Sequence, residues 1–285
     1  MNNKVPYKLY QGDCLEIMAQ LPDNSIDALV TDPPFTMAGG LSNGRSSTVD
    51  SQFFSFWWQA VCKELNRIIK PEGEGFIWCD WRTAQVIADG FKPKNQTYDT
   101  LAVTQMIHHY RKMIGQGKPF RNSVDLIAYV RGAKSTGERI PNTTPNFIEK
   151  YWYYGKHDNH PAEKDVEMCA QLLEWCSDKG AIVLDPFMGS GAVGKACASM
   201  GRGFIGIEKD FDYFAIAEKG VTEAYTMKSV KLKKALPPIS PSLFNINASQ
   251  QSVHLTGGDS AAFQALSTPE VDSTIGADST PPTSR

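Results

Sequence analysis

The sequence contains no long apolar run. No segment reaches the ~18 to 20 apolar residues of a membrane-spanning helix. The first residues, Met1–Pro6, are not followed by the apolar stretch that a secretion signal requires. We therefore expect a cytoplasmic protein with no membrane partner.

The sequence also lacks cysteine pairs and clusters of metal ligands. It has no Cys-x-x-Cys spacing, and several of its cysteines fall at apolar positions of expected helices or strands, which favours reduced core thiols over disulfides or zinc. His157 and His160 lie on either side of Asp158, but no second group of ligands accompanies them. We expect no bound metal.

A strong charge of one sign is absent as well. The chain of 285 residues has 29 basic and 31 acidic residues and a net charge of −2. The segment from Ala235 onward holds four acids and one base, so the remainder is close to neutral. Contact with nucleic acid would therefore depend on a local patch. The strongest candidate is a glycine-containing stretch that could follow phosphates or form a solvated hairpin, with the cations Arg111, Lys112, Lys118 and Arg121.

An acidic motif follows the apolar stretch Ile26–Thr31, which predicts a strand. This motif is Asp32-Pro33-Pro34-Phe35. Two consecutive prolines restrict the backbone, so the carbonyl of Pro33 is held in a defined direction beside the carboxylate of Asp32. Two such acceptors suit a planar amine, and the ring of Phe35 offers a stacking surface for a base taken out of its duplex. The alternative is an ordinary turn at the end of a strand.

A second motif combines a strand, a glycine turn and a helix. Residues 181–184 predict a short buried strand and residues 192–200 a helix. Another apolar strand, 203–207, ends in Glu208, whose carboxylate could accept both hydroxyls of a ribose. The turn lacks the third glycine of the dinucleotide fingerprint, which favours S-adenosylmethionine over a pyrophosphate. The turn contains Asp185, Phe187, Gly189, Ser190 and Gly191.

Together these motifs resemble those of the DNA amino-methyltransferases. That family pairs an Asp/Ser/Asn-Pro-Pro-Tyr/Phe/Trp catalytic tetrapeptide with a Phe-x-Gly-x-Gly cofactor turn. The catalytic motif comes first here, as in the circularly reordered β group, and the resemblance covers roughly residues 8 to 219. It implies a Rossmann-like α/β fold with a mostly parallel seven-stranded sheet. It also implies S-adenosyl-L-methionine as the methyl donor.

Two further segments are similar to motifs of this family. Asp13 and Cys14 match its opening segment, in which the Asp approaches the adenine of the cofactor; Asp13 could also cap a helix. His160 and Lys164 match its His-Pro-x-x-Lys segment, which lies against the methionine end of the cofactor. The family usually continues with proline, but Asp165 stands here and could cap a helix.

The remaining segments divide the chain into a methyltransferase domain, residues 1–234, and a low-complexity tail, 235–285, that we expect to be disordered. Residues 36–52 are glycine-rich and predict a mobile lid in which Arg45 meets a phosphate. Residues 132–159 predict a short target-recognition insertion. Its aromatic run could face DNA or form a buried strand.

Between these segments the pattern predicts further regular elements. A helix is expected over 53–69, ended by Pro71-Glu72-Gly73 before a strand at 75–79. Trp57 and Trp58 of this helix could stack on bases, although core packing is favoured. Strands are expected at 101–107 and 124–130, on either side of the basic stretch.

The resemblance predicts a methyltransferase that acts on N6 of adenine in double-stranded DNA. A flipped adenine would stack on Phe35 and donate its amino hydrogens to Asp32 and Pro33. Cytosine N4 is the alternative within the family, because Ser often replaces the first Asp there. RNA or a protein glutamine as substrate, and a non-catalytic DNA-binding module, are more remote alternatives. A second copy of the chain and a cognate restriction endonuclease remain open as partners.

Overall fold

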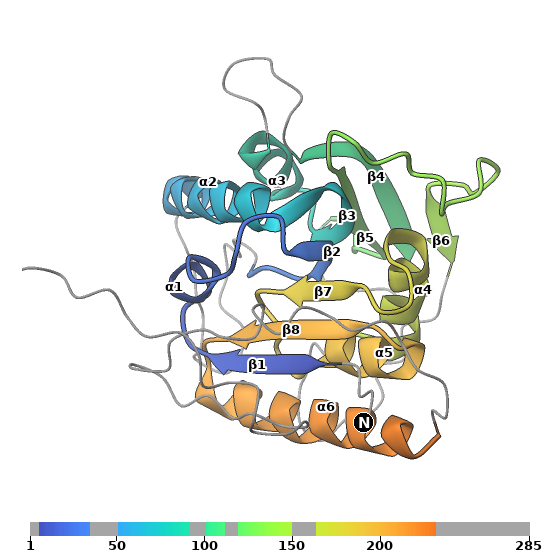
Figure 1. Cartoon of the computed structure of the whole chain (residues 1–285). Helices are drawn as coiled ribbons and strands as arrows, with labels where there is room; N and C mark the ends of the chain where they lie inside the picture. Colours follow the sequence, from blue (N-terminus) through green and yellow to red (C-terminus); the bar gives the residue numbers. More distant parts are fainter. Residues whose placement is uncertain (1–5, 35–50, 92–100, 112–118, 150–163, 232–285) are drawn as a thin grey trace, which may run out of the picture.

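The computed structural model describes residues 6–34, 51–91, 101–111, 119–149 and 164–231 (Figure 1). The predicted lid and tail therefore lie outside the described residues, apart from the end of the lid at 51–52. Strands and helices alternate along most of the chain. In order they are β1 (Tyr7–Gln11), α1 (Cys14–Met18), β2 (Ile26–Thr31), α2 (Ser51–Ile68), β3 (Ile69–Cys79), α3 (Ala84–Gly90), β4 (Ala102–Tyr110), β5 (Val124–Arg131), β6 (Phe147–Glu149), α4 (Val166–Cys176), β7 (Ile182–Asp185), α5 (Ala192–Met200), β8 (Gly203–Glu208) and α6 (Phe211–Lys231).

All the strands of the described residues join one sheet in the order β1-β8-β7-β2-β3-β5-β4-β6. β5 pairs antiparallel with both β3 and β4, and the other neighbours pair in parallel. The mostly parallel α/β sheet is as predicted, but it has eight strands instead of seven. Two of the strands correspond to no predicted range: β1, and the three-residue β6, which pairs with the end of β4 at the edge of the sheet.

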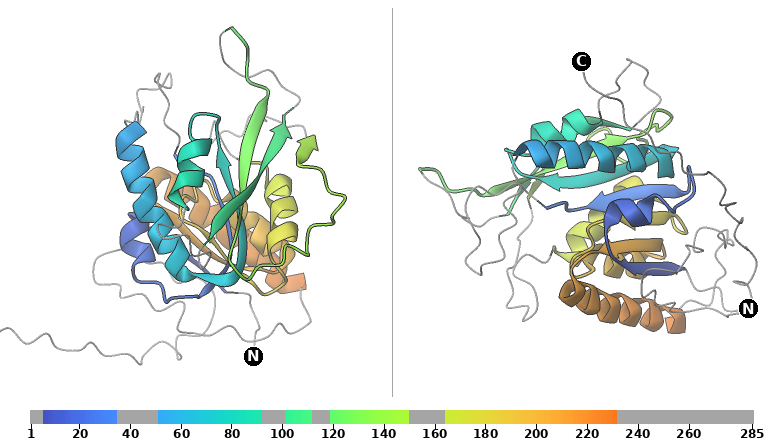
Figure 2. Two further views of the ribbon diagram at one scale, coloured as in Figure 1. Left: turned by 90° about the horizontal axis from the view of Figure 1, so that it is seen from above. Right: turned by 90° about the vertical axis from the view of Figure 1, so that its left-hand side faces the viewer.

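Helices cover both faces of the sheet (Figures 1 and 2). One core joins the inner faces of α1, α2 and α3 to strand residues such as Leu29 and Ile77. The other joins α4, α5 and α6 to residues such as Val30 and Phe204. Successive strand residues point to opposite faces, so a strand covered on both faces is apolar throughout. This explains why β2 and β7 contain the uninterrupted apolar segments Ala28–Val30 and Ile182–Leu184.

The junction between α2 and β3 differs from the prediction. Pro71-Glu72-Gly73 does not separate the helix from the strand, because β3 begins at Ile69 and includes these residues. Ile69 pairs with Ile26 of β2, and the pairing shifts register between Ile26 and Ala28. Lys70 Nζ also lies 2.5 Å from Asp27 Oδ1. The pairing with β2 therefore extends the strand past residues whose local preference is for a turn.

Part of the predicted recognition insertion, 132–159, is tied to the amino ends of the parallel strands. Glu74 is 1% exposed and accepts hydrogen bonds from Tyr129 Oη at 3.0 Å, from the Gly137 amide at 3.1 Å and from the Ser135 hydroxyl. The Gly132 amide donates to the carbonyl of Gly73 at 2.8 Å. The start of this insertion is therefore held at the amino ends of the parallel strands, whereas Asp32 lies at their carboxyl ends. Residues 150–159 lie outside the described part.

Other expectations concern the membrane, the thiols and a metal. Within the described residues, no helix has the length and apolar character needed to cross a membrane. All six cysteines are buried free thiols, and burial raises the pKa of Cys14 and Cys79 to about 12. The part of the chain that the structure describes contains no group of three or more His, Cys, Asp or Glu residues suited to a metal ion.

Candidate active site

The two motifs meet at the centre of the sheet. β2 and β7 are parallel neighbours, with Ala28 opposite Val183 and Leu29 opposite Leu184. β2 leads through α2 to β3 on one side, and β7 leads through α5 to β8 on the other. The chain thus leaves the two strands in opposite directions, which opens a crevice at their carboxyl ends. The motifs that follow these strands are brought together in that crevice.

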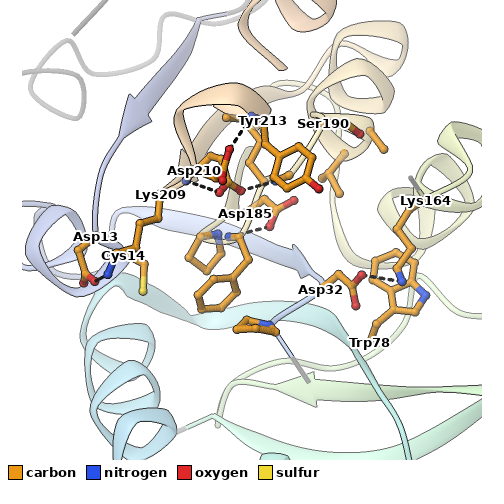
Figure 3. Close-up of a pocket in the computed structure, with 18 of the residues that line it drawn as sticks. Asp13, Cys14, Asp32, Trp78, Lys164, Asp185, Ser190, Lys209, Asp210 and Tyr213 are labelled. Atoms are coloured by element: carbon orange, nitrogen blue, oxygen red, sulfur yellow. Dashed lines mark hydrogen bonds and ion pairs between the residues drawn. The ribbon is translucent and has the colours of Figure 1, made fainter. Parts of the chain in front are cut away.

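A cavity of about 630 Å³ lies at this crevice (Figure 3). Its volume is within the range of small-molecule sites, ~300 to 1,000 Å³. Aromatic side chains and proline rings form much of its wall, while carboxylates and lysines approach from several strand ends. The lining residues are Gly12, Asp13, Cys14, Asp32, Pro34, Trp57, Trp78, Lys164, Asp185, Pro186, Phe187, Met188, Gly189, Ser190, Ala192, Val193, Glu208, Lys209, Asp210 and Tyr213.

The two glycines of the turn have different roles in the structure. Both have positive φ, +53° at Gly189 and +84° at Gly191, a conformation that side chains rarely adopt. A Cβ at Gly189 would meet no protein atom within 4 Å. A Cβ at Gly191 would lie 2.8 Å from Val221 and 3.2 Å from Ala217 of α6. Gly189 therefore lines the cavity, whereas Gly191, predicted to bind the cofactor, allows α5 to pack against α6.

Glu208 closes the turn from the neighbouring strand. Its Oε2 accepts from the Gly189 amide and its Oε1 from the Asp210 amide, each at 2.8 Å. Burial raises the pKa of Glu208, and these backbone donors act in the opposite direction. A carboxylate has about four acceptor positions, so both oxygens can accept a further hydrogen bond from a ligand. Glu208 is fixed in place and still able to bind a diol.

Asp13 lies at the Glu208 end of the cavity. Its Oδ1 accepts from the Leu15 amide at 3.0 Å, which confirms the predicted role as a helix cap. Its Oδ2 lies 3.1 Å from Lys209 Nζ. Because Asp13 and Cys14 also line the cavity, capping and ligand contact are compatible.

Asp185 links the two motifs. It is 2% exposed, and its Oδ1 accepts from Thr31 Oγ1 at 2.7 Å and from the Phe187 amide at 3.2 Å. Burial raises its pKa to about 7, and the charges of Asp32 and Glu208 add to this shift. Thr31 immediately precedes Asp32, so this hydrogen bond aligns the ends of β2 and β7.

Asp32 is paired with a lysine from the segment before α4. Lys164 Nζ lies 2.6 Å from Asp32 Oδ2, and also 5.5 Å from the centre of the Trp78 ring (Figure 3). The two charged side chains are 15% and 26% exposed, respectively. Lys164, predicted beside the cofactor, thus contacts the predicted catalytic carboxylate.

Five of the predicted site residues lie outside the described residues: Phe35, Arg45, Lys112, Lys118 and His160. Pro34 lines the cavity, and Pro33 lies between it and Asp32.

Of the predicted phosphate-binding stretch, 111–121, the structure describes residue 111 and residues 119–121. The side chain of Arg111 is 12% exposed; its Nη2 donates to the Asn122 carbonyl at 3.1 Å and its Nε lies 3.5 Å from Asp125 Oδ2. Arg111 therefore holds the base of the β4–β5 connection together, because its charge is already paired there. Arg121 is exposed, as the prediction requires.

Several residues at the cavity were missed or given another role. Trp57, favoured as core, lines the cavity and packs against Phe187 with ring centres 5.4 Å apart, while Trp58 is buried as expected. Lys209 and Asp210 follow Glu208 directly, and Asp210 accepts from the amide of Tyr213, in the first turn of α6, at 3.1 Å. Their position immediately after a functional acid could have indicated them. Trp78, which also lines the cavity, carried no comparable signal.

The arrangement can hold a polar, partly apolar ligand beside a fixed carboxylate. Gly189 and Glu208 offer close backbone approach and hydroxyl acceptors at one end, and Asp32 offers an amine acceptor at the other. Apolar side chains, among them Trp57, Phe187 and Val193, line the cavity as well. The geometry therefore suits transfer between two bound molecules, where positioning provides much of the rate.

Comparison with known proteins identifies similar chains. A family model described as DNA methylase matches residues 26–219. The chain is 28% identical over 212 residues to the putative methylase YubD of Escherichia coli (strain K12), covering 70% of this chain and 84% of YubD. It is 24% identical over 255 residues to the DNA adenine methyltransferase YhdJ of the same organism, covering 79% and 86% of the two chains.

Solved structures share the fold. The M1.HpyAVI-SAM complex aligns with a TM-score of 0.58 at 24% identity, covering 75% of this chain and 98% of that one. The PvuII DNA methyltransferase, described as cytosine-N4-specific, aligns with a TM-score of 0.58 at 16% identity, covering 80% and 96%. At these identities the likeness establishes the fold alone.

Proposed function

Since the chain belongs to the DNA methylase family of N6- and N4-methyltransferases, we propose that it transfers a methyl group from S-adenosyl-L-methionine to the N6 amino group of adenine in double-stranded DNA. The observation that carries the proposal is that Asp32 lines one cavity together with Asp185 and Gly189 of the glycine turn and Glu208 of β8. Either motif by itself could be an ordinary turn after a strand. Their convergence at the carboxyl ends of adjacent strands is what a two-substrate transfer requires.

The residues present fit S-adenosylmethionine. Gly189 leaves open space where any larger residue would place a side chain, so a ligand can approach the backbone there. Glu208 and Asp13 carry carboxylates at the same end, suited to the ribose hydroxyls and the adenine. Phe187 and Trp57 provide an apolar surface. When bound, the cofactor supplies an electrophilic methyl group on a positively charged sulfur.

The chain's own residues position the target amine. The carboxylate of Asp32 accepts one amino hydrogen, and the carbonyl of Pro33 accepts the other, so the nitrogen lone pair is released from conjugation with the base. Thr31 and Asp185 keep the end of β2 aligned with the cofactor turn through their 2.7 Å hydrogen bond. We propose that Phe35, which lies outside the described residues, supplies the stacking surface for the base. Since the methyl group is already activated, these residues contribute mostly through position.

Adenine is proposed over cytosine because the first residue of the tetrapeptide is Asp, and one of the similar proteins is named a DNA adenine methyltransferase. The specificity stated for the PvuII enzyme keeps cytosine N4 as the second candidate. Both bases present an exocyclic amine, and Asp32 can accept from either.

The test is incubation of the purified protein with methyl-labelled S-adenosylmethionine and duplex DNA of mixed sequence, followed by analysis of the nucleosides. We expect N6-methyldeoxyadenosine. Asp32→Ala should abolish transfer while cofactor affinity stays within about twofold. N4-methyldeoxycytidine as the product would refute the adenine assignment, and methylation of RNA or protein instead of DNA would refute the proposed substrate.

A further inference from the structure

The ion pair between Lys164 and Asp32 joins two distant parts of the chain. Asp32 follows β2 at the centre of the sheet, and Lys164 lies just before the helix α4, which packs on one face of the sheet. Their side chains meet at 2.6 Å inside the cavity wall (Figure 3). The ammonium of Lys164 thus lies directly on the predicted catalytic carboxylate.

The surroundings make the pair stronger than one on the surface. The Trp78 side chain, which is 1% exposed, lies under the ammonium at 5.5 Å. Shielding from water lowers the local dielectric constant and strengthens the attraction between opposite charges. The aromatic face adds a cation–π contact. Lys164 is thus held between a ring and a carboxylate.

The charges of the cavity give this lysine a particular role. The carboxylates of Asp32, Asp185 and Glu208 all face the same space. Among the described residues lining the cavity, the other lysine is Lys209, and it lies 3.1 Å from Asp13. Lys164 is therefore the lysine placed to offset the negative charge at the Asp32 end. The charge of Asp32 contributes to the raised pKa of Asp185, and the ammonium of Lys164 offsets part of that charge.

We infer that Lys164 is a positioning residue that acts through Asp32, orienting its carboxylate toward the target amine, and not a residue that holds the cofactor. This inference rests on the proposed function. One bond from Lys164 to Oδ2 leaves the carboxylate with acceptor positions for the amine.

The test compares Lys164→Met and Lys164→Arg with the wild-type protein. Misplacement of a reacting group by about 1 Å can lower a rate about a hundredfold. We expect Lys164→Met to lower kcat by about that factor, while the Kd and KM for S-adenosylmethionine change less than about twofold. Lys164→Arg should recover part of kcat, because arginine keeps the charge-assisted bond to the carboxylate. Lys179→Met, an exposed lysine before β7, is the matched control and should retain wild-type kinetics.

The outcomes separate the possible roles. Unchanged kcat with a raised Kd for S-adenosylmethionine would overturn the inference and assign Lys164 to the cofactor. Equal losses in Lys164→Met and Lys164→Arg, with lowered melting temperatures, would show a structural role and also overturn it. If Lys164→Met does not fold, Lys164→Gln replaces it with the same expectation. Absence of DNA methylation by the wild-type protein would instead refute the proposed function.

Discussion

The buried carboxyl group of Asp185 predicts a defined pH dependence of stability. Its ordinary pKa is near 3.8, and burial raises the pKa in the folded protein to about 7. A raised folded pKa means that the native state binds the proton more tightly than the unfolded state. The stabilisation that the protonated Asp185 provides is therefore complete below its unfolded-state pKa, near 3.8, and is lost as pH rises through its folded-state pKa of about 7.

The magnitude follows from the two pKa values. One pKa unit corresponds to about 1.36 kcal/mol. Between pH 5 and pH 8 the protonated native form is lost, and the linkage relation gives a decrease of about 2 to 3 kcal/mol in the free energy of unfolding. Asp185→Asn cannot ionise, yet its amide oxygen can still accept from Thr31 and the Phe187 amide. The free energy of unfolding of the variant should rise by about 2 to 3 kcal/mol relative to that of the wild type when pH is raised from 5 to 8.

The assay is urea denaturation of both proteins at pH 5, 6, 7 and 8. Taking the difference between variant and wild type removes the groups that titrate in both. Asp178→Asn is the matched control, because Arg139 lowers the pKa of that carboxyl and its contribution is constant over this range. If the difference in free energy of unfolding between Asp185→Asn and the wild type stays constant with pH, the reasoning is refuted. It would mean that water or movement relieves the burial of the carboxylate.

Two further predictions concern binding. Gly189→Val should weaken S-adenosylmethionine binding at least about tenfold by calorimetry, since the added side chain occupies open cavity space and φ is positive there. Gly180→Val, also at a positive φ with no atom nearby, is the control for backbone strain alone. If both variants bind S-adenosylmethionine with equal affinity, the cofactor pocket has been assigned to the wrong place. Arg121→Gln should lower the slope of log K against log salt concentration for DNA binding by about one unit, for all sequences. Arg111→Gln should instead lower the free energy of unfolding, because Arg111 is paired with Asp125. If only Arg111→Gln lowers the salt slope, these two assignments are reversed.

Much of the fold was predictable because its signals are local. The helix 192–200 is bounded by glycines in the left-handed conformation, and the prediction matches α5. Asp165 caps α4 through the Glu167 amide at 2.8 Å, as expected. In contrast, β3 begins earlier than predicted because Ile69 pairs with β2. A local pattern of proline and glycine cannot report a partner strand.

The candidate site was predictable in its residue types but not in its contacts. The sequence by itself determined that Asp32, Asp185 and Glu208 follow apolar strands, because strand period and turn residues are read over a few positions. Only the tertiary structure decided that Lys164 meets Asp32, that Thr31 meets Asp185, and that Arg111 is paired within its own connection. These contacts join residues that are far apart along the chain or across strands. Their formation depends on strand order, register and packing, which no short segment of sequence contains.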